Sequence, residues 1–144
     1  MNIPIKKLHP DAVLPALATA GSAGADLRTR IDQPVVLPPG GRALLSTGIA
    51  VGLPSGTVGL IFARSGLASK HGIALANGVG VVDSDYTGEV KVALCNLSDK
   101  PYTVRPGERV AQLAVLPVYA VRFSEVAELA ATERGAGGFG STGV

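Results

Sequence analysis

The sequence predicts one all-β domain, a sandwich, barrel or jelly roll with a single short helix, and three observations lead there. Glycine and proline, the residues that destabilise a helix most, supply 19 and 10 of the 144 residues, about a fifth against about 12% in average proteins. Turn-forming motifs recur along the chain, and the segments between them are rich in Val, Ile and Leu. Hydrophobic residues make up 47% of the chain and charged ones 17%, which is enough apolar material for one core.

Turn motifs delimit the expected strands. They lie at residues 38–41, 53–56, 77–78, 85–88, 98–101 and 105–107, and the apolar runs between them include 57–63, 79–82, 89–94 and 110–118. The uncharged segment 43–63 is long enough to span a membrane. Because Pro54, Ser55 and Gly56 form a turn motif in its middle, the segment predicts two strands joined by a tight turn, and we expect no membrane association.

The single expected helix follows the apolar run 57–63. Ser65 is a candidate N-cap residue, residues 67–70 give one or two turns, and Gly72 is a candidate left-handed residue at the C-terminal end. Arg64, Ser65 and Gly66 combine a guanidinium, a hydroxyl and free helix N–H groups, which is typical of a phosphate site. An ordinary N-cap beside a surface arginine is the alternative.

Residues 83–88, Asp-Ser-Asp-Tyr-Thr-Gly, directly follow the apolar run 79–82. They resemble the start of a calcium loop, but Thr87 and Leu94 stand where ligands are needed. They also match the nucleophile motif of haloacid-dehalogenase-like phosphatases, whose parallel sheet needs long helices that this sequence does not predict. Two interpretations stay open: a solvated Asp-rich turn, and a β-hairpin whose turn presents Asp83 as a general base.

The last ten residues, 135–144, hold five glycines and few groups to bury, which predicts a flexible tail. Phe139 and the nearby Arg134 suggest a flap that orders on a ligand; a disordered tail with an incidental aromatic residue is the alternative. The G-x-G-x-x-G match at 135–140 is not a dinucleotide-binding motif, because no helix can follow it.

The net charge and the small number of histidines and cysteines argue against several further classes of protein. The formal net charge is +2, with no run of Lys or Arg, which argues against nucleic-acid binding. His9 and His71 have no second ligand spaced for zinc. Cys95 is the only cysteine, and Pro4 lies where a secretory signal would need apolar residues, so we expect a cytoplasmic protein.

Five segments, in this order, resemble the five motifs of the homotrimeric deoxyuridine triphosphatases. They are residues 23–28, 63–73, 77–88, 106–113 and 134–143. The resemblance implies a distorted β jelly roll over residues 1–133 and a Gly-rich flap, 134–144, that closes over the nucleotide. It also implies a homotrimer whose active sites each draw on several subunits.

The same resemblance implies the hydrolysis of dUTP to dUMP and pyrophosphate, which removes dUTP and supplies dUMP for dTMP synthesis. Mg²⁺ would sit on the triphosphate and on waters, with no direct protein ligand. Asp83 would activate the water that attacks the α-phosphorus, and Asp26 would be a supporting carboxylate. The implied substrate-binding residues are Arg64, Ser65, Gly66 and Gln112 for the phosphates; Asn77, Val81, Val82, Tyr86 and Lys91, in a hairpin over 81–91, for the uracil and deoxyribose; and Arg134, Phe139, Gly140 and Ser141 in the flap.

Two other functions stay open. The related dCTP deaminases expect a glutamate in the strand after the hairpin and a second serine after Arg-Ser, where this chain has Ala93 and Gly66. A catalytically silent nucleotide-binding trimer is the other alternative, against which stand the retained Asp83, Arg64 and Gln112.

Overall fold

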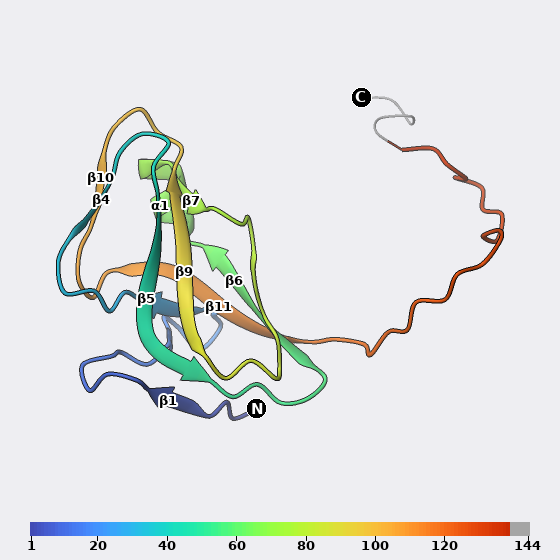
Figure 1. Ribbon diagram of the computed structural model, residues 1–144, viewed down its shortest axis with the longest axis horizontal. Coiled ribbons are helices and arrows are strands. Elements are labelled where there is room, and N and C mark those ends of the chain that lie inside the picture. Colours follow the sequence, from blue (N-terminus) through green and yellow to red (C-terminus); the bar gives the residue numbers. More distant parts are fainter. Residues whose placement is uncertain (139–144) are drawn as a thin grey trace.

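The computed structural model describes residues 1–138, and those up to the end of the last strand at Pro117 fold as an all-β domain with one helix, as predicted (Figure 1). In chain order, the strands and the helix of this described part are β1 (Ile5–Lys7), β2 (Ala16–Leu17), β3 (Ala25–Arg28), β4 (Val35–Leu37), β5 (Arg42–Val51), β6 (Thr57–Ala63), α1 (Ser65–His71), β7 (Ile73–Leu75), β8 (Gly80–Val82), β9 (Glu89–Asn96), β10 (Tyr102–Val104) and β11 (Arg109–Pro117).

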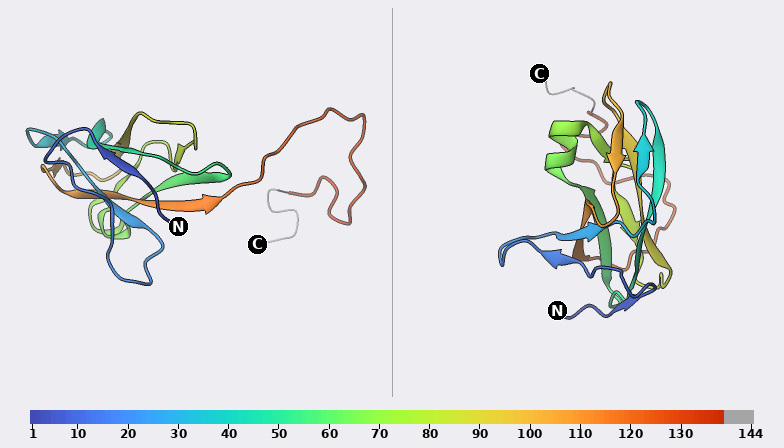
Figure 2. Two further views of the ribbon diagram at one scale, coloured as in Figure 1. Left: turned by 90° about the horizontal axis from the view of Figure 1, so that it is seen from below. Right: turned by 90° about the vertical axis from the view of Figure 1, so that its left-hand side faces the viewer.

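Two antiparallel sheets carry the fold. One has the strand order β1-β5-β9-β7 and the other β2-β3-β11-β6-β8, while β4 and β10 form a separate two-stranded ribbon. From β5 to β9 the chain changes from one of these two sheets to the other at every step. Strands that are consecutive in the sequence therefore face each other across the core more often than they pair (Figures 1 and 2).

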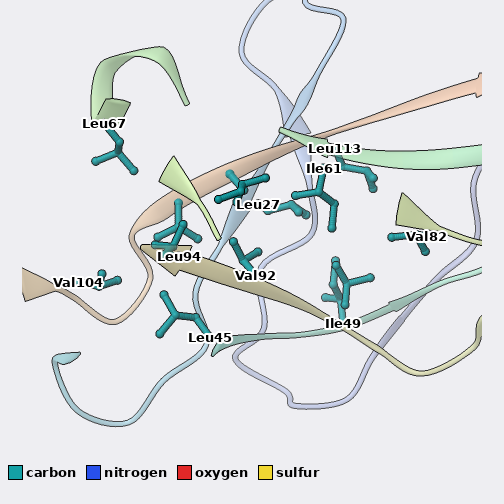
Figure 3. Packing of buried hydrophobic residues seen from close by; sticks show 14 of the residues in the cluster. Leu27, Leu45, Ile49, Ile61, Leu67, Val82, Val92, Leu94, Val104 and Leu113 are labelled. Atoms are coloured by element: carbon teal, nitrogen blue, oxygen red, sulfur yellow. The ribbon is translucent and has the colours of Figure 1, made fainter. Parts of the chain in front are cut away.

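Aliphatic side chains fill the space between the sheets (Figure 3). Ile49 and Val92 come from one sheet and Leu27 and Ile61 from the other, and none of the four is more than 4% exposed. Leu67 brings α1 onto the same cluster. Each such side chain contributes about 1.5–3 kcal/mol when fully buried, so this core fixes where the two sheets present their ends.

The uncharged segment 43–63 forms two strands and a turn, as predicted. Gly56 has a φ of 78° in the turn before β6, a left-handed conformation that favours glycine. β5 pairs with β1 and β9, whereas β6 pairs with β11 and β8, so the two strands are not a hairpin. Within residues 1–138 no helix is long and apolar enough to cross a membrane.

The helix prediction is right at the C-terminal end of α1 and wrong by one residue at its start. Gly72 ends α1 with a φ of 65°, and its N–H donates to the carbonyl of Ala68 at 3.0 Å. Ser65 is already helical, and the N-cap position is Arg64, whose side chain makes no capping hydrogen bond. The Arg64 guanidinium is instead engaged by a carboxylate on β3, described below.

The predicted hairpin over 81–91 is the main error in the fold. β8 pairs with β6, and β9 pairs with β5 and β7, so β8 and β9 belong to different sheets. Residues 83–88 therefore form a loop that carries the chain from one layer to the other. A turn motif between two apolar runs shows where the chain reverses, but the partner of each strand is decided by the whole core.

The chain leaves the domain after β11. Residues 118–138 form neither helix nor strand and run away from the sheets (Figure 1). This segment, which we call the C-terminal arm, exposes a series of large apolar side chains: Val118, Tyr119, Val121, Phe123, Val126 and Leu129. The predicted flap residues Phe139, Gly140 and Ser141 lie outside the described residues.

Candidate active site

Most of the predicted site residues line two cavities. The first lies where β3, β6 and β11 meet α1, and we call it the arginine pocket. On β11, Gln112 pairs with Asp26 of β3 on one side and Phe62 of β6 on the other. The chain leaves β6 at Ala63 and enters α1 through Arg64. The cavity has a volume of about 320 Å³ and is lined by Ala18, Ser22, Ala23, Gly24, Asp26, Arg64, Ser65, Gly66, Arg109 and Gln112.

Asp26 holds two arginines at this pocket. Nε of Arg64 donates to one carboxylate oxygen at 2.9 Å, and Nη1 of Arg109 donates to the other at 3.0 Å. The Asp26 side chain is 18% exposed, while that of Arg109 is 44% exposed. Each guanidinium has five N–H donors, so both arginines keep donors beyond these bonds. Two arginines against one aspartate give the pocket a net positive charge, which suits a polyanion.

Gln112 contributes its amide to the same pocket. Its Nε2 donates to the backbone carbonyl of Ala63 at 3.1 Å. A Cβ added at Gly24 would stand 2.7 Å from the Gln112 amide oxygen, so the glycine leaves the space that this amide occupies. The amide oxygen is an acceptor, which suits a bound water better than a phosphate oxygen.

Neither packing nor backbone conformation requires a glycine at position 66. A Cβ at this position would meet no heavy atom within 4 Å, and its φ is not in the left-handed range. Alanine would favour a helix by about 1 kcal/mol relative to glycine. Since the backbone N–H groups at the start of α1 have no helical partner, the missing side chain keeps them accessible from the pocket.

The second cavity lies between β8 and β9, where the two strands separate toward different sheets, and we call it the loop pocket. Asp83 follows β8 directly and is exposed at the edge of this cavity. The loop pocket has a volume of about 330 Å³ and is lined by Leu44, Ile61, Asn77, Gly80, Val81, Val82, Asp83, Tyr86, Glu89, Val90 and Lys91.

Contacts at the end of the loop 83–88 fix the rim of this pocket. The Tyr86 hydroxyl donates to the backbone carbonyl of Glu89 at 2.9 Å. The tyrosine ring lies directly over Gly88, where a Cβ would stand 2.5 Å from the hydroxyl oxygen. The carboxylate of Glu89 in turn accepts the N–H of Gly48 at 2.8 Å. The aromatic ring predicted to contact the deoxyribose is thus held in one place.

The two pockets have no lining residue in common among those described, and Asp83 and Arg64 lie at opposite ends of β6. In the antiparallel pair of β6 and β8, Val82 lies opposite Gly59, so Asp83 continues toward Val58. Arg64 follows the other end of β6. Six residues, from 58 to 64, at a strand rise of about 3.3 Å separate the two ends by about 20 Å. One chain therefore does not bring Asp83 next to Arg64.

Arg134 lies in neither pocket. Its Nε donates to the carbonyl of Gly137 at 2.8 Å, and its own carbonyl accepts the Gly137 N–H at 3.0 Å, which closes a local turn in the C-terminal arm. Within residues 1–138, no three His, Cys, Asp or Glu side chains gather in a way that could hold a metal ion.

A larger cavity, of about 610 Å³, lies around Tyr102 and contains none of the predicted site residues. The Tyr102 hydroxyl donates to the carboxylate of Glu108. Burial, together with this bond, raises the pKa of Tyr102 to about 12, so its hydroxyl keeps its proton at neutral pH. The ring also lies against His71, with 5.0 Å between the ring centres.

Sequence reasoning missed two charged residues of the pockets, Arg109 and Glu89. Arg109 stands inside the segment 106–113, but its role depends on Asp26, which the pairing of β3 with β11 brings beside it. Glu89 begins a strand, and its contact with Gly48 depends on an irregularity in β5. Neither partner is near in sequence, so no local pattern points to either contact.

The chain is similar in sequence and in structure to known proteins of one family. The dUTPase family model matches residues 11–143. A deoxyuridine 5'-triphosphate nucleotidohydrolase from Desulfitobacterium hafniense is 52% identical over 132 residues, which cover 91% of this chain and 87% of the relative. One from Coxiella burnetii is 50% identical over 139 residues, covering 96% and 91%. A dUTPase variant of the Staphylococcus bacteriophage 80alpha, solved with dUpNHpp, has a TM-score of 0.90 at 29% identity over 99% of both chains.

The matches agree with the fold built from the residues. The likeness to dUTPase structures confirms the predicted jelly roll, which here consists of the two crossed-over sheets. All residues that line the arginine pocket and the loop pocket lie inside the matched range 11–143. The chain belongs to the dUTPase family.

Proposed function

We propose that this protein hydrolyses dUTP to dUMP and pyrophosphate. One observation carries the proposal: every described residue of the predicted site except Arg134 lines one of the two pockets. The relatives named above bear the name of this activity. The reaction removes dUTP and supplies dUMP for dTMP synthesis, and we place it in the cytoplasm, where that synthesis draws on the nucleotide pool.

The two pockets divide the substrate between them. The arginine pocket takes the triphosphate, with donors from Arg64, Ser65 and Gly66. The loop pocket takes the uracil and deoxyribose, with the backbone of Val81, Val82 and Lys91 and the side chain of Asn77 around them. A narrow pocket excludes the thymine methyl group, and backbone donors and acceptors left unpaired reject cytosine.

Asp83 acts as the general base in this proposal. Its carboxylate accepts a proton from a water whose oxygen forms a bond to the α-phosphorus, while the bond from that phosphorus to the bridging oxygen of pyrophosphate breaks. The arginines neutralise charge on the departing pyrophosphate. The position of Asp83 at the rim of the loop pocket supports this role, because the α-phosphate is attached to the deoxyribose.

Magnesium fits the arginine pocket through waters rather than through a direct protein bond. Both carboxylate oxygens of Asp26 already accept from arginines, so a hydrated ion on the phosphates is the arrangement that the pocket supports. The amide oxygen of Gln112 would accept from a metal-bound water. Bound Mg²⁺ supplies neutralisation of the triphosphate charge. A dUTPase of the S. aureus phage phi11, 25% identical to this chain, was solved as a variant that reveals the coordination of a structural Mg(II) ion.

The separation of the pockets supports a homotrimer with shared sites. Because about 20 Å of β6 separates Asp83 from Arg64 in one chain, the arginine pocket of one copy has to meet the loop pocket of another. The C-terminal arm supports self-association independently. Tyr119 and Phe123, in this arm, are 94% and 96% exposed, and such apolar side chains are normally buried against a partner.

We propose that the chain has two functional units, a domain over residues 1–133 and a C-terminal flap over residues 134–144. The flap closes over the bound nucleotide. Arg134 would pair with the γ-phosphate and Phe139 would stack on the uracil, while Gly140 and Ser141 would contact the phosphates. Closure excludes water and completes the set of charge-stabilising groups only when a triphosphate is bound.

Deletion of residues 134–144 is expected to leave a folded trimer with at least about a hundredfold lower kcat/KM for dUTP, since each lost phosphate contact in a closed site costs roughly tenfold or more. Pyrophosphate release and analytical ultracentrifugation measure the two properties. Full activity in the truncated protein would remove the flap from the mechanism.

Gly24→Ala is expected to lower kcat/KM roughly tenfold, because the new methyl group displaces the Gln112 amide and the loss of about 1.4 kcal/mol of transition-state stabilisation corresponds to a factor of ten. Gly21→Ala is the matched control, since a Cβ there meets no heavy atom within 4 Å. Steady-state kinetics of both variants test the role of Gln112. Equal kcat/KM values for the two variants would contradict it.

The proposed activity is tested by a pyrophosphate-release assay with dUTP, dTTP, dCTP and UTP, alongside an ammonia assay with dCTP. We expect turnover of dUTP far above the other three and no ammonia. Release of ammonia would indicate a dCTP deaminase, binding of dUTP without turnover would indicate the silent trimer, and equal turnover of all four would indicate a general phosphatase.

A further inference from the structure

We propose that Glu89 is a positioning residue for nucleoside selection. Its carboxylate holds the start of β9 on β5, and its backbone carbonyl holds Tyr86 at the rim of the loop pocket. The inference rests on the proposed function, in which the loop pocket takes the uracil and deoxyribose.

The contact starts at an irregularity in β5. Ser46 pairs with Lys91, and Ala50 pairs with Glu89, so four steps along β5 correspond to two steps along β9. The additional residues form a bulge that includes Gly48, which is buried and has a φ of 71°. Ladder pairing is interrupted here, and the Gly48 N–H donates instead to Oε1 of Glu89 at 2.8 Å. The carboxylate thus satisfies a buried donor that the bulge takes out of the sheet.

Glu89 also contacts the loop 83–88, so its bond to Gly48 restrains Tyr86 as well. The Tyr86 hydroxyl donates to the Glu89 carbonyl at 2.9 Å, and the ring lies over Gly88. The side chain of Glu89 is therefore fixed to β5 while its backbone fixes Tyr86. The other carboxylate oxygen is 3.7 Å from Nζ of Lys91, and only 22% of the glutamate side chain is exposed. Among the described residues, no other side-chain hydrogen bond ties Tyr86 to the domain.

The position of Tyr86 bears on selectivity because Tyr86, Glu89 and Lys91 all line the loop pocket. When the Gly48 contact is lost, only a fraction of the molecules keeps the pocket in its binding arrangement, and the apparent affinity is the intrinsic affinity multiplied by that fraction. Asp83 lies on the β8 side of the pocket and keeps its place. KM for dUTP should therefore rise while kcat stays nearly constant, and a loosened rim should admit the additional hydroxyl of UTP.

The test compares Glu89→Ala with Glu89→Gln. Gln keeps an oxygen that can accept the Gly48 N–H, and Ala does not. For Glu89→Ala we expect KM for dUTP to rise roughly tenfold, the effect of losing one charge-assisted hydrogen bond. We also expect kcat to stay within about twofold, the preference for dUTP over UTP to fall, and amide hydrogen exchange at Gly48 to accelerate. Glu89→Gln should restore KM, selectivity and slow exchange to near the parent values.

Thr47→Val is the matched control for general destabilisation. The Thr47 hydroxyl donates to the carbonyl of Val90 at the same junction of β5 and β9, so its loss weakens the junction without touching the Gly48 contact. We expect a lower Tm with KM and selectivity unchanged. A Thr47→Val protein with the kinetics of Glu89→Ala, or a Glu89→Gln protein that fails to restore KM, would overturn the proposal.

The design separates the two proposals. A parent protein that does not hydrolyse dUTP contradicts the proposed function, whereas normal parent activity with unchanged KM and selectivity in Glu89→Ala contradicts only the role of Glu89. Hydrogen exchange at Gly48 reports on the contact in either case.

Discussion

Asp83→Asn is expected to lower kcat for dUTP hydrolysis by about 10²–10⁴-fold, the contribution typical of a general base. Asparagine keeps the shape of the side chain, but its amide cannot accept the proton of the attacking water. Because the substitution leaves the arginine pocket and the rest of the loop pocket intact, binding of dUpNHpp should stay within about threefold of the parent affinity. Pyrophosphate release at saturating dUTP and titration calorimetry with the analogue measure the two quantities.

Asp85→Asn provides the matched control. Asp85 stands two residues further along the same loop and is exposed, but it does not line the loop pocket. It undergoes the same loss of charge, so any effect of the loop's overall charge should appear in both variants. We expect Asp85→Asn to keep nearly full activity. Similar losses of kcat in the two variants would exclude the assignment of Asp83 as the base.

Two inactive variants should regain activity when their subunits are mixed. Asp83→Asn removes the base at the loop pocket and Arg64→Ala removes a guanidinium from the arginine pocket. About 20 Å separates Asp83 from Arg64 in one chain. If each active site joins the arginine pocket of one subunit to the loop pocket of the next, every mixed trimer contains one site in which both halves are intact.

Random mixing in equal amounts predicts recovery of about one quarter of the parent sites, since roughly three quarters of the trimers are mixed and each has one intact site of three. The experiment unfolds and refolds the two variants together and measures pyrophosphate release, with separately refolded proteins as the control. Activity that stays at the level of those controls would mean that Asp83 and Arg64 of one chain serve the same site.

The structural class and the chain reversals could be predicted because their causes are local. Gly56 and Gly72 adopt left-handed conformations at the positions where the sequence predicts a turn and a helix end. The hairpin over 81–91 could not be predicted correctly, because β8 pairs with β6 and β9 pairs with β5 and β7, and the two strands do not pair with each other. Strand pairing is a property of the assembled core.

The candidate site shows the same division. The residue types of the segment from Arg64 to Gly66 were sufficient to predict a phosphate site without any knowledge of the fold. The same is not true of the second arginine, because Arg109 gains its place from Asp26, 83 residues earlier in the chain. The distance between Asp83 and Arg64 could not be predicted from the sequence either, since it depends on the register of β6 against β8.

The placement of Asp83 and Arg64 at opposite ends of β6 also has a genetic consequence. In a trimer built from shared sites, a subunit with both Asp83→Asn and Arg64→Ala disables the site to which it gives the base and the neighbouring site to which it gives the arginine. Only the third site survives. A damaged allele expressed beside an intact one would therefore act dominantly, and the cell would lose more activity than the share of defective chains.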